Sequence, residues 1–194
     1  MKTLKSLAVF VLALSLSTAV FAGSQKVDAA KSSVKWLAKK VTGEHSGTIG
    51  IKEGNLVVDK DKITSGKVVI DMNSIVCLDL TDAGYNAKLI GHLKSPDFFE
   101  VATFPTAELA INKVDSKGNS HTFSGNLTIK GITNPASFTA TSVKVGTATT
   151  YTGTLVIDRS KYNVRYGSKS FFDNLGDKVI NDEFTLDFTL VVSE

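Results

Sequence analysis

The sequence predicts an all-β protein, an eight-stranded antiparallel up-and-down barrel with one helical insertion between its third and fourth strands. Apolar and polar residues alternate over most of the chain, which is the pattern of strands with one buried face. Several alternating segments are joined by short polar stretches such as VDKDK, VDSKGN and KVGTA, which favour hairpins between sequence neighbours. Closing such a meander removes its two exposed edges, so a barrel is favoured over a sandwich.

The alternation is clearest in EFTLDFTLVV, near the end of the chain. Phe184, Leu186 and Phe188 share one face of this predicted strand, and threonine and aspartate occupy the other face. HTFSGNLTI and TYTGTLVI show the same arrangement. Eight strands are predicted in this way, at residues 32–40, 47–57, 63–72, 106–114, 121–129, 136–145, 149–158 and 183–192.

The segment TDAGYNAKLIGHL at 81–93 differs because its apolar residues recur at helical spacing. Tyr85, Leu89 and either His92 or Leu93 form a stripe along one side. A helix is therefore predicted here, with this stripe packed against the rest of the domain.

The first residues have the composition of a secretory signal peptide. Lys2 and Lys5 precede an apolar stretch, and small residues end it at Ala22. We therefore expect a cleaved segment at 1–22, a single barrel domain at 23–194 and a periplasmic location. The net charge of the full chain is +3, which falls to +1 when the two lysines are removed. Because no block of like charges follows, a nucleic-acid partner is not expected.

Cys77 is the sole cysteine of the sequence, so an internal disulfide is impossible and stability must come from the core. The three histidines, His45, His92 and His121, show no i, i+4 spacing, and Cys77 has no cysteine companion. On these grounds neither a metal site nor another cofactor is expected. Cys77 is interpreted as a small apolar residue near a strand end.

The longer connections are predicted to gather at one end of the barrel, which we call the mouth. Antiparallel neighbours place alternate connections at opposite ends, so those after the first, third, fifth and seventh strands share an end. They contain KVTGEHSG at 40–47, the helix followed by SPDFFEVATF at 95–104, KGITNP at 130–135, and a long loop that includes 165–182.

Four phenylalanines lie in these mouth segments: Phe98, Phe99, Phe171 and Phe172. Burying one such side chain is worth about 1.5–3 kcal/mol, so we expect all four to fold over the open end of the barrel. Two interpretations are open. The segments form a lid or rim over an apolar cavity, or they plug the barrel and complete its core.

Residues on the inward faces of the strands are the candidate ligand contacts. An eight-stranded barrel is either filled by its own side chains or holds one small ligand. The apolar interior candidates are Trp36, Ile49, Ile51, Val68, Ile70, Leu109, Phe123, Leu127, Phe138, Leu155, Ile157, Phe184, Leu186 and Phe188.

Four polar residues of the mouth segments are candidates for contact with a ligand head group such as a phosphate, carboxylate or quinone oxygen. They are His45, His92, Arg159 and Arg165. Alternatively, His92 is a packed core residue and the two arginines brace the mouth loop by pairing with its acids. These acids are Asp158, Asp173, Asp177 and Asp182. His121 lies beside a turn at the opposite end and is expected to be solvated.

Several of these segments resemble the YceI-like family of bacterial periplasmic proteins. The similar stretches are KKVTGEHSGTI, IDMNSI, KLIGHLKSPDFFEV, FPTAEL, GNLTIKGIT and IDRSKYNVRYGSKSFFDNLGDKVINDEF, which follow one another across the predicted domain. The resemblance implies a lipocalin-like barrel whose interior binds a long-chain amphiphile, such as a polyisoprenoid, a quinone or a fatty amide. It also implies that a homodimer and a link with stress response are to be expected.

A binding function needs no catalytic group. A hydrocarbon tail gains about 0.8 kcal/mol for each buried CH₂, and the cost of ordering the ligand reduces this gain. The hypothesis is therefore a carrier for a long-chain lipid, with at most transient membrane contact for ligand exchange. Two alternatives stay open: a lipid-modifying enzyme that uses His45 and His92, and a packed barrel that acts as a stress-response interaction protein.

Overall fold

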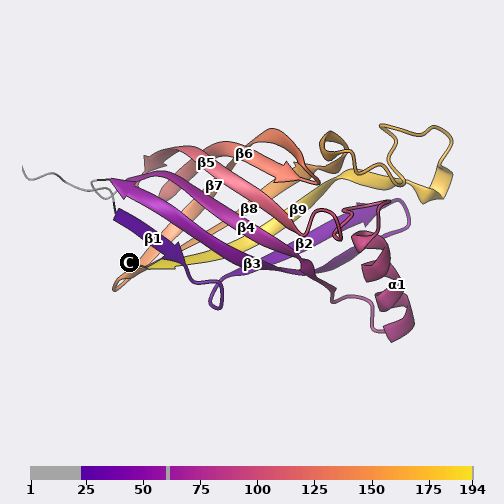
Figure 1. Cartoon of the computed structure of the whole chain (residues 1–194), viewed down its shortest axis with the longest axis horizontal. Helices are drawn as coiled ribbons and strands as arrows, with labels where there is room; N and C mark the ends of the chain where they lie inside the picture. The colour runs from indigo at the N-terminus through magenta and orange to yellow at the C-terminus, as the bar shows by residue number, and fades with distance from the viewer. Residues whose placement is uncertain (1–22, 60–61, 194) are drawn as a thin grey trace, which may run out of the picture.

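The computed structural model describes residues 23–59 and 62–193, so the predicted signal peptide at 1–22 lies outside the described residues. The described chain folds into an antiparallel sheet and an α-helix (Figure 1). The elements are β1 (Gly23–Val27), β2 (Ser33–Lys40), β3 (Gly43–Asp59), β4 (Lys62–Cys77), α1 (Ala83–Lys94), β5 (Thr106–Lys117), β6 (Ser120–Ile129), β7 (Ile132–Val145), β8 (Ala148–Asp158) and β9 (Ile180–Ser193), with short 3₁₀ helices at Arg159–Tyr162 and Gly176–Lys178.

The sheet closes into the predicted barrel. From β4 to β9 each strand pairs antiparallel with the next, β9 pairs with β2, and β2 pairs with β3. Pairing of β3 with β4 completes the ring, with Ile51 opposite Ile70 and Gly54 opposite Val68. All eight predicted strands are present, and β3 and β4 extend well beyond their predicted bounds. The barrel is therefore longer than the alternation alone indicated.

The first strand, β1, was missed by the sequence analysis. It pairs with β3, where Gln25 is opposite Leu56, and with β9, where Val27 is opposite Val192. Further along the barrel, β2 pairs with the same two strands. β1 and β2 therefore share one position in the ring, and the Asp28 side chain caps the turn between them by accepting backbone hydrogen bonds. A strand of five residues is too short for its alternation to be recognised.

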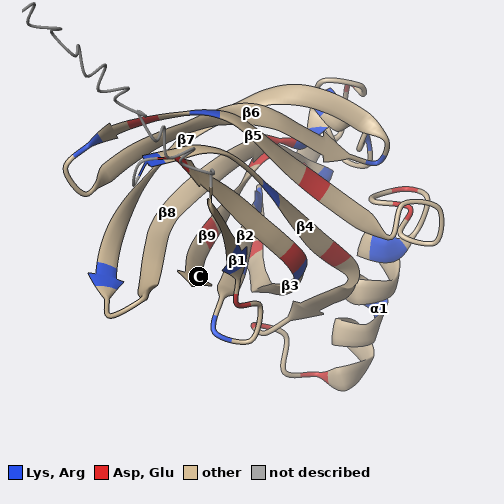
Figure 2. Cartoon of the chain, turned by 60° about the vertical axis from the view of Figure 1, so that its left-hand side comes forward, with Lys and Arg blue, Asp and Glu red and all other residues tan. Residues whose placement is uncertain are grey.

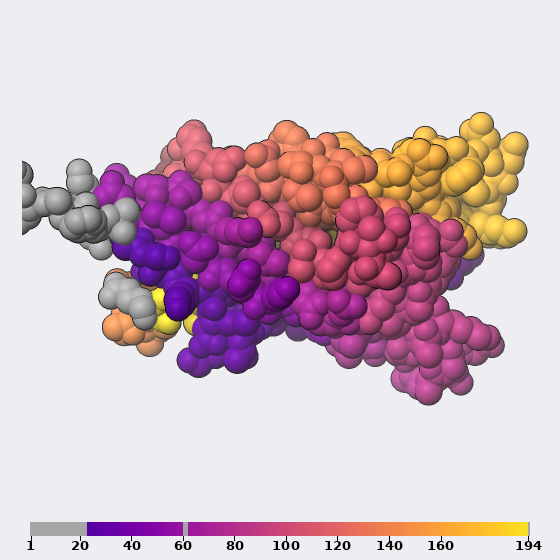
Figure 3. All heavy atoms as spheres, viewed as in Figure 1, coloured from indigo at the N-terminus to yellow at the C-terminus, as the bar shows by residue number. Residues whose placement is uncertain are grey.

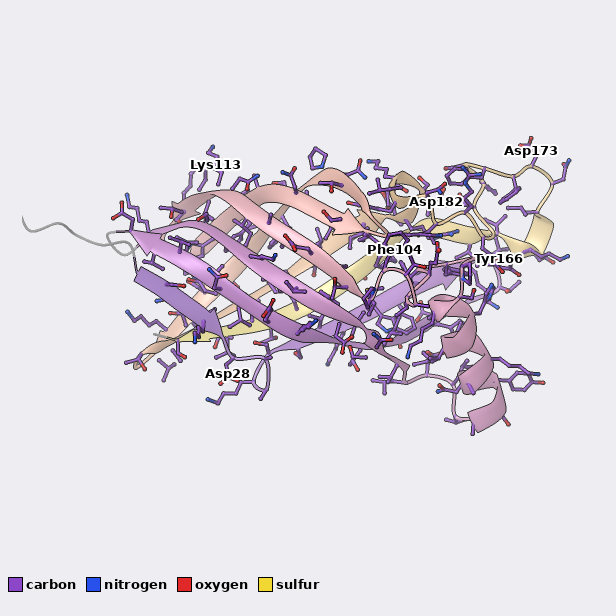
Figure 4. The ribbon with its side chains drawn as sticks, viewed as in Figure 1. Asp28, Phe104, Lys113, Tyr166, Asp173 and Asp182 are labelled. Atoms are coloured by element: carbon purple, nitrogen blue, oxygen red, sulfur yellow. The ribbon has the colours of Figure 1, made fainter. Side chains whose placement is uncertain are left out.

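The connections lie at the two ends as predicted. The helix α1 and the segment 159–179 lie at the mouth end, whereas the β5–β6 and β7–β8 hairpins lie at the opposite end, which we call the far end (Figure 1). In the space-filling view, α1 and the segment after β8 form the surface of the mouth end (Figure 3). Tyr166, Asp173 and Asp182 all lie at this end (Figure 4).

Two of the four mouth connections are much shorter than predicted. The stretches 40–47 and 130–135 are mostly strand, and the turns consist of residues 41–42 and 130–131. Lys130 and Gly131 both have positive φ, at 51° and 73°, as the favoured two-residue hairpin turns require. The prediction was wrong because glycine and polar residues were assigned to loops, although strands contain them too.

The helix α1 begins after Asp82, whose side chain accepts a hydrogen bond from the Tyr85 amide at 2.9 Å. Leu89, Ile90 and Leu93 pack against the core. The predicted stripe was wrong for Tyr85. Its side chain is exposed, and the ammonium of Lys88 lies above its ring. None of the helices in the described residues is long and apolar enough to cross a membrane.

The inward side chains form two apolar clusters along the barrel. The cluster of the mouth half includes Trp36, Phe98 and Ile157, and that of the far half includes Leu56 and Phe123. The inward position of these apolar side chains follows from the period-two alternation, since one face of each strand is buried and the other meets water. Charged residues of both signs occur on strands and on loops (Figure 2).

Candidate functional site

The barrel interior contains two neighbouring cavities. One, of about 110 Å³, lies in the mouth half and is called the mouth cavity; the other, of about 90 Å³, lies in the far half and is called the far cavity. Ile70, Leu127 and Leu186 line both, so the cavities adjoin along the barrel. The other lining side chains are apolar apart from a few: Arg159 and Asn181 in the mouth cavity, and Tyr151 in the far cavity.

The structure places all fourteen predicted interior residues on the walls of these cavities, although their contact with a ligand stays a prediction. Trp36, Ile49, Ile157 and Phe184 line the mouth cavity; Ile51, Val68, Leu109, Phe123, Phe138, Leu155 and Phe188 line the far cavity; Ile70, Leu127 and Leu186 line both.

Further lining residues were not among the predicted candidates. Tyr151 and Leu190 lie on strand faces that the alternation had identified as apolar, so a signal for them was present. Ile75 and Ile180 belong to the extensions of β4 and β9, which the predicted bounds did not contain, whereas the others lie inside predicted elements. The additional residues are Val34, Leu56, Ile111, Tyr151 and Leu190 in the far cavity, and Ala38, Met72, Ile75, Leu93, Ala107, Ile129 and Ile180 in the mouth cavity.

Each cavity is smaller than the roughly 150 Å³ apolar cavity that binds one benzene molecule. Neither cavity alone therefore holds a long hydrocarbon tail. Phe138, Leu186 and Phe188 are only partly buried although they face the interior, since they border this unfilled space. A long tail that occupies both cavities must pass the side chains that line both, which are Ile70, Leu127 and Leu186.

Phe98 and Phe99 cover the mouth cavity from the segment after α1. Phe98 is buried, and its ring lies 5.6 Å from that of Tyr166, whereas Phe99 lies 6.4 Å from Phe184 between ring centroids. Backbone hydrogen bonds from both phenylalanines fold this segment back on the end of α1, with the Phe99 amide bound to the Leu93 carbonyl at 3.1 Å.

Phe171 and Phe172 do not cover the mouth, so the expectation that all four phenylalanines are buried there was wrong. Their exposed fractions are 37% and 48%, and the guanidinium of Arg165 lies 5.0 Å from the centre of the Phe171 ring. Instead, Tyr162 and Val164 from the same loop are buried in the mouth cluster. The loop thus closes the mouth with its first residues and leaves its phenylalanines at the surface.

Arg159 holds the mouth loop closed from within. Its guanidinium, 4% exposed, donates hydrogen bonds to the carbonyls of Val164 at 2.9 Å, Ile180 at 3.1 Å and Asn181 at 3.1 Å. It therefore joins the start of the loop to the start of β9. Burial lowers the pKa of Arg159, while the carboxylates of Asp182 and Asp158 act in the opposite direction.

The acids near the mouth support this bracing role of Arg159. Asp182 Oδ1 lies 3.5 Å from Arg159 and has no hydrogen-bond donor within the described ranges, so the nearby guanidinium balances its charge. Asp182 Oδ2 accepts a hydrogen bond from Ser170 at 2.7 Å.

Asp158 caps the 3₁₀ helix at Arg159–Tyr162 by accepting a hydrogen bond from the Ser160 amide. Arg165 differs, since it donates to the side chain of Asn163 rather than to an acid.

His45 lies in a cluster with Cys77 and Asp79 at the rim, and none of the three lines either cavity. His45 Nδ1 is 2.8 Å from Asp79 Oδ2, while Asp79 Oδ1 accepts hydrogen bonds from the Ser46 amide at 2.7 Å and from the Cys77 thiol at 3.1 Å. Partial burial raises the pKa of Asp79, but the hydrogen bonds from Ser46, His45 and Cys77 outweigh it and lower the pKa to about 2. Burial raises the pKa of the Cys77 thiol.

The other two histidines have different surroundings. His92 packs edge-on against Phe98 and Tyr166, with ring centroids 4.9 Å and 4.4 Å away. His121 is not merely solvated as expected, because its two ring nitrogens each lie 2.8 Å from a hydroxyl, that of Ser116 or that of Ser142. Burial lowers the pKa of His121. His45 and His92 therefore have separate partners.

A surface groove lies outside the mouth, between the loop after α1 and the loop after β8. Its walls carry charges of both signs, namely those of Asp97, Lys130, Arg165 and Lys178. Lys130 is partly engaged, since its ammonium donates to the Pro96 carbonyl at 3.0 Å. The groove therefore has charged side chains and the exposed rings of Tyr166 and Phe172 in its walls, next to the mouth.

A family model for YceI-like domains matches residues 25–192. Among curated relatives, a UPF0312 protein of Shewanella denitrificans is 32% identical over 95 residues, 48% of this chain and 47% of the relative. A UPF0312 protein of Pseudomonas aeruginosa is 30% identical over 103 residues, 53% of this chain and 48% of the relative. The chain thus spans about half the length of the curated relatives it matches.

Solved structures show the same fold. Burkholderia cenocepacia BcnA is 29% identical, with a TM-score of 0.67, covering 85% of this chain and 98% of that protein. A polyisoprenoid binding domain from Saccharophagus degradans, implicated in plant cell wall breakdown, is 16% identical, with a TM-score of 0.63, covering 87% and 97%. At that identity the second likeness concerns the fold alone.

Proposed function

The chain belongs to the family of YceI-like domains, and from this premise we propose that it binds and carries a long-chain amphiphile. The tail would lie in the mouth and far cavities, and the polar head would lie toward the mouth. One observation carries the proposal: two adjoining cavities with apolar walls run along the interior of a closed barrel. This is the arrangement that suits a hydrocarbon chain rather than a compact polar ligand.

The energetics favour tail burial as the main source of affinity. Each CH₂ moved from water into an apolar site contributes about 0.8 kcal/mol. The cost of association, and the cost of moving side chains such as Leu127 and Leu186 aside, reduce the net gain. Apolar walls discriminate poorly between similar tails, so polyisoprenoids, quinones and fatty amides are all accepted in this proposal. The polyisoprenoid class is supported by the description of the Saccharophagus degradans domain of similar fold.

The head group is assigned to the mouth because polar side chains are concentrated there. Arg159 and Asn181 reach the mouth cavity, and Arg165 and Lys178 line the groove outside it. Arg159 already donates to three carbonyls, so the exposed cations of the groove are the better partners for an anionic head.

The remaining expectations belong to the same proposal. A periplasmic location after removal of 1–22, transient membrane contact during ligand exchange, and a homodimer all suit a lipid carrier. Each has a direct measurement: cell fractionation, vesicle flotation and the mass of the protein in solution. The fully packed barrel considered from the sequence is less well supported, because the interior contains unfilled space.

The proposal is tested with the purified protein in two steps. Mass spectrometry of its solvent extract is expected to detect a long-chain amphiphile. A polyprenol is then titrated while the emission of Trp36 is followed, since Trp36 lines the mouth cavity and is the one tryptophan of the sequence. Leu186→Phe fills the space shared by both cavities and is expected to weaken binding roughly tenfold.

Val156→Phe is the matched control, because Val156 lies on the next strand with its side chain exposed. It is expected to bind as the unaltered protein does. An extract without lipid, together with Trp36 emission that does not change with any tail, would contradict the proposal.

A further inference from the structure

Three residues at the rim of the barrel offer a set of metal-ligand atoms that no part of lipid binding uses. His45 Nδ1, Cys77 Sγ and an Asp79 carboxylate oxygen all lie within 4.8 Å of one another. We infer that these three side chains form a binding site for a single Zn²⁺ ion. None of them lines either cavity, so the inference stands apart from the proposed lipid carrier.

The barrel itself brings the three side chains together. Gly47 of β3 is opposite Cys77 of β4, so residues thirty positions apart in sequence become neighbours. Ser46 holds the next residues in place, because its carbonyl accepts from the Leu78 amide at 2.9 Å and its amide donates to Asp79 at 2.7 Å. The ligand atoms are therefore positioned by paired backbone, which suits a preformed site.

The distances fit a tetrahedral ion after small movements. Zn²⁺ bonds of about 2.0–2.3 Å at tetrahedral angles place neighbouring ligand atoms about 3.3–3.7 Å apart. His45 Nδ1 lies 2.8 Å from Asp79 Oδ2 and Cys77 Sγ lies 3.1 Å from Asp79 Oδ1, and one ligand atom from each of the three side chains lies within 4.8 Å of the other two. The ligand atoms therefore need to shift by about 1 Å or less to reach the tetrahedral spacing. The His45 and Asp79 side chains are 26% and 31% exposed, which leaves them room to rotate.

The chemistry of the set favours zinc over harder cations. Imidazole nitrogen, thiolate sulfur and carboxylate oxygen are the three ligand types of zinc sites, whereas Mg²⁺ and Ca²⁺ prefer oxygen alone. The Asp79 carboxylate accepts hydrogen bonds from the Ser46 amide and the Cys77 thiol, so its oxygens face the other two ligands as acceptors. The Cys77 thiol releases its proton to solvent as the sulfur binds. His45 Nδ1 donates its hydrogen to Asp79 in this structure, so binding requires the other tautomer of the imidazole, with the hydrogen on Nε2 and the Nδ1 lone pair on the ion. Partial exposure of His45 and Asp79 leaves the fourth position open to water.

The competing interpretation is a hydrogen-bonded cluster that only joins β3 to the end of β4. It predicts no saturable metal binding, whereas the zinc site predicts one ion per chain. Chelator-treated protein titrated with ZnCl₂ by calorimetry is expected to give a stoichiometry of one and a dissociation constant in the micromolar range or below. Titration with Co²⁺ is expected to give the charge-transfer absorption of a cobalt–thiolate bond.

Three variants locate the site. Cys77→Ser is expected to abolish the cobalt–thiolate absorption, and His45→Gln to weaken Zn²⁺ binding at least tenfold, the lower bound for loss of even an outer-shell partner. His121→Gln, which alters a histidine bound by two serines at the far end, is expected to change neither. Should Cys77→Ser fail to fold, His45→Gln and the cobalt spectrum of the unaltered protein decide the question.

Absence of saturable Zn²⁺ binding by the unaltered protein overturns the inference, as does binding without a cobalt–thiolate absorption. Binding that His45→Gln leaves unchanged, or that His121→Gln weakens equally, also overturns it. If the unaltered protein binds zinc but no polyprenol, only the proposed lipid carrier is contradicted. The two proposals can therefore be rejected independently of each other.

Discussion

The two ends of the barrel are closed by different means. At the far end, residues of the strands themselves fill the interior: Leu56 and Val192 are fully buried, and both lie in hydrogen-bonded ladders. At the mouth, connecting segments close the barrel, with Val164 fully buried and Arg159 bound to loop carbonyls. Opening the far end requires strands to separate, whereas opening the mouth requires only a loop to move. The mouth is therefore the expected path for a ligand.

Arg159→Met breaks the closure of the mouth and has the largest expected effect. It leaves the carbonyls of Val164, Ile180 and Asn181 without their donor and removes the charge that faces Asp182. Removing one partner of a buried ionic group costs about 3–5 kcal/mol, so the free energy of unfolding is expected to fall by about that amount. Urea denaturation measures it.

Arg165→Met is the control for this change, because Arg165 lies in the same loop but is exposed. It is expected to alter the free energy of unfolding by less than about 0.5 kcal/mol. Equal effects of the two substitutions would mean that Arg159 does not hold the mouth closed.

Val192→Ala tests the far end. Val192 is fully buried between β1 and β8, and its loss of two methyl groups leaves a small void. The expected loss of stability is about 2 kcal/mol, and the rate of ligand uptake is expected to stay unchanged. Val145→Ala, at a side chain 74% exposed, is the matched control. Faster uptake in Val192→Ala would show that ligands pass through the far end instead.

Asp79→Asn tests how much an ionised side chain at the rim of the mouth stabilises that end of the barrel. The pKa of Asp79 is about 2, below the ordinary value of 3.8, so its ionised form stabilises the fold. This contribution is complete above about pH 4 and is lost as the pH falls through 2. Allowing for solvent screening of a partly exposed group, the substitution is expected to cost about 1 kcal/mol at pH 7. Unfolding curves are expected to show a smaller difference in the free energy of unfolding between the unaltered protein and Asp79→Asn at pH 2.5 than at pH 7.

Phe171→Ser combined with Phe172→Ser has the smallest expected effect on stability. Both residues lie at the surface, 37% and 48% exposed, so the free energy of unfolding is expected to change by less than about 0.5 kcal/mol. Slower polyprenol uptake with unchanged stability would identify the pair as a docking element at the mouth. A loss of 2 kcal/mol or more would mean that the rings are buried, contrary to the structure.

The sequence predicted the barrel well because one face of each long strand must be apolar. The inward position of Phe184, Leu186 and Phe188 follows from alternation alone, and the structure places them on the cavity walls. Alternation failed for β1, which is too short, and for 40–47 and 130–135, where glycines and polar residues continue the strands.

The details of the mouth could not be predicted in the same way, because they depend on contacts between distant segments. Alternation does not say which apolar residues of an irregular loop turn inward, so Tyr162 and Val164 were overlooked in favour of Phe171. The cluster of Cys77 with His45 depends on the register of β3 against β4, which spacing in sequence does not reveal.

The division of one barrel position between β1 and β2 has a consequence for self-association. Only five residues at the start of the described chain cover the last part of β3 and the end of β9. If they detach, two rows of unpaired amides and carbonyls become available to a strand from another molecule. Removal of Gly23–Val27 is thus expected to convert a closed surface into a template for intermolecular sheet formation, visible as chain exchange or fibril growth.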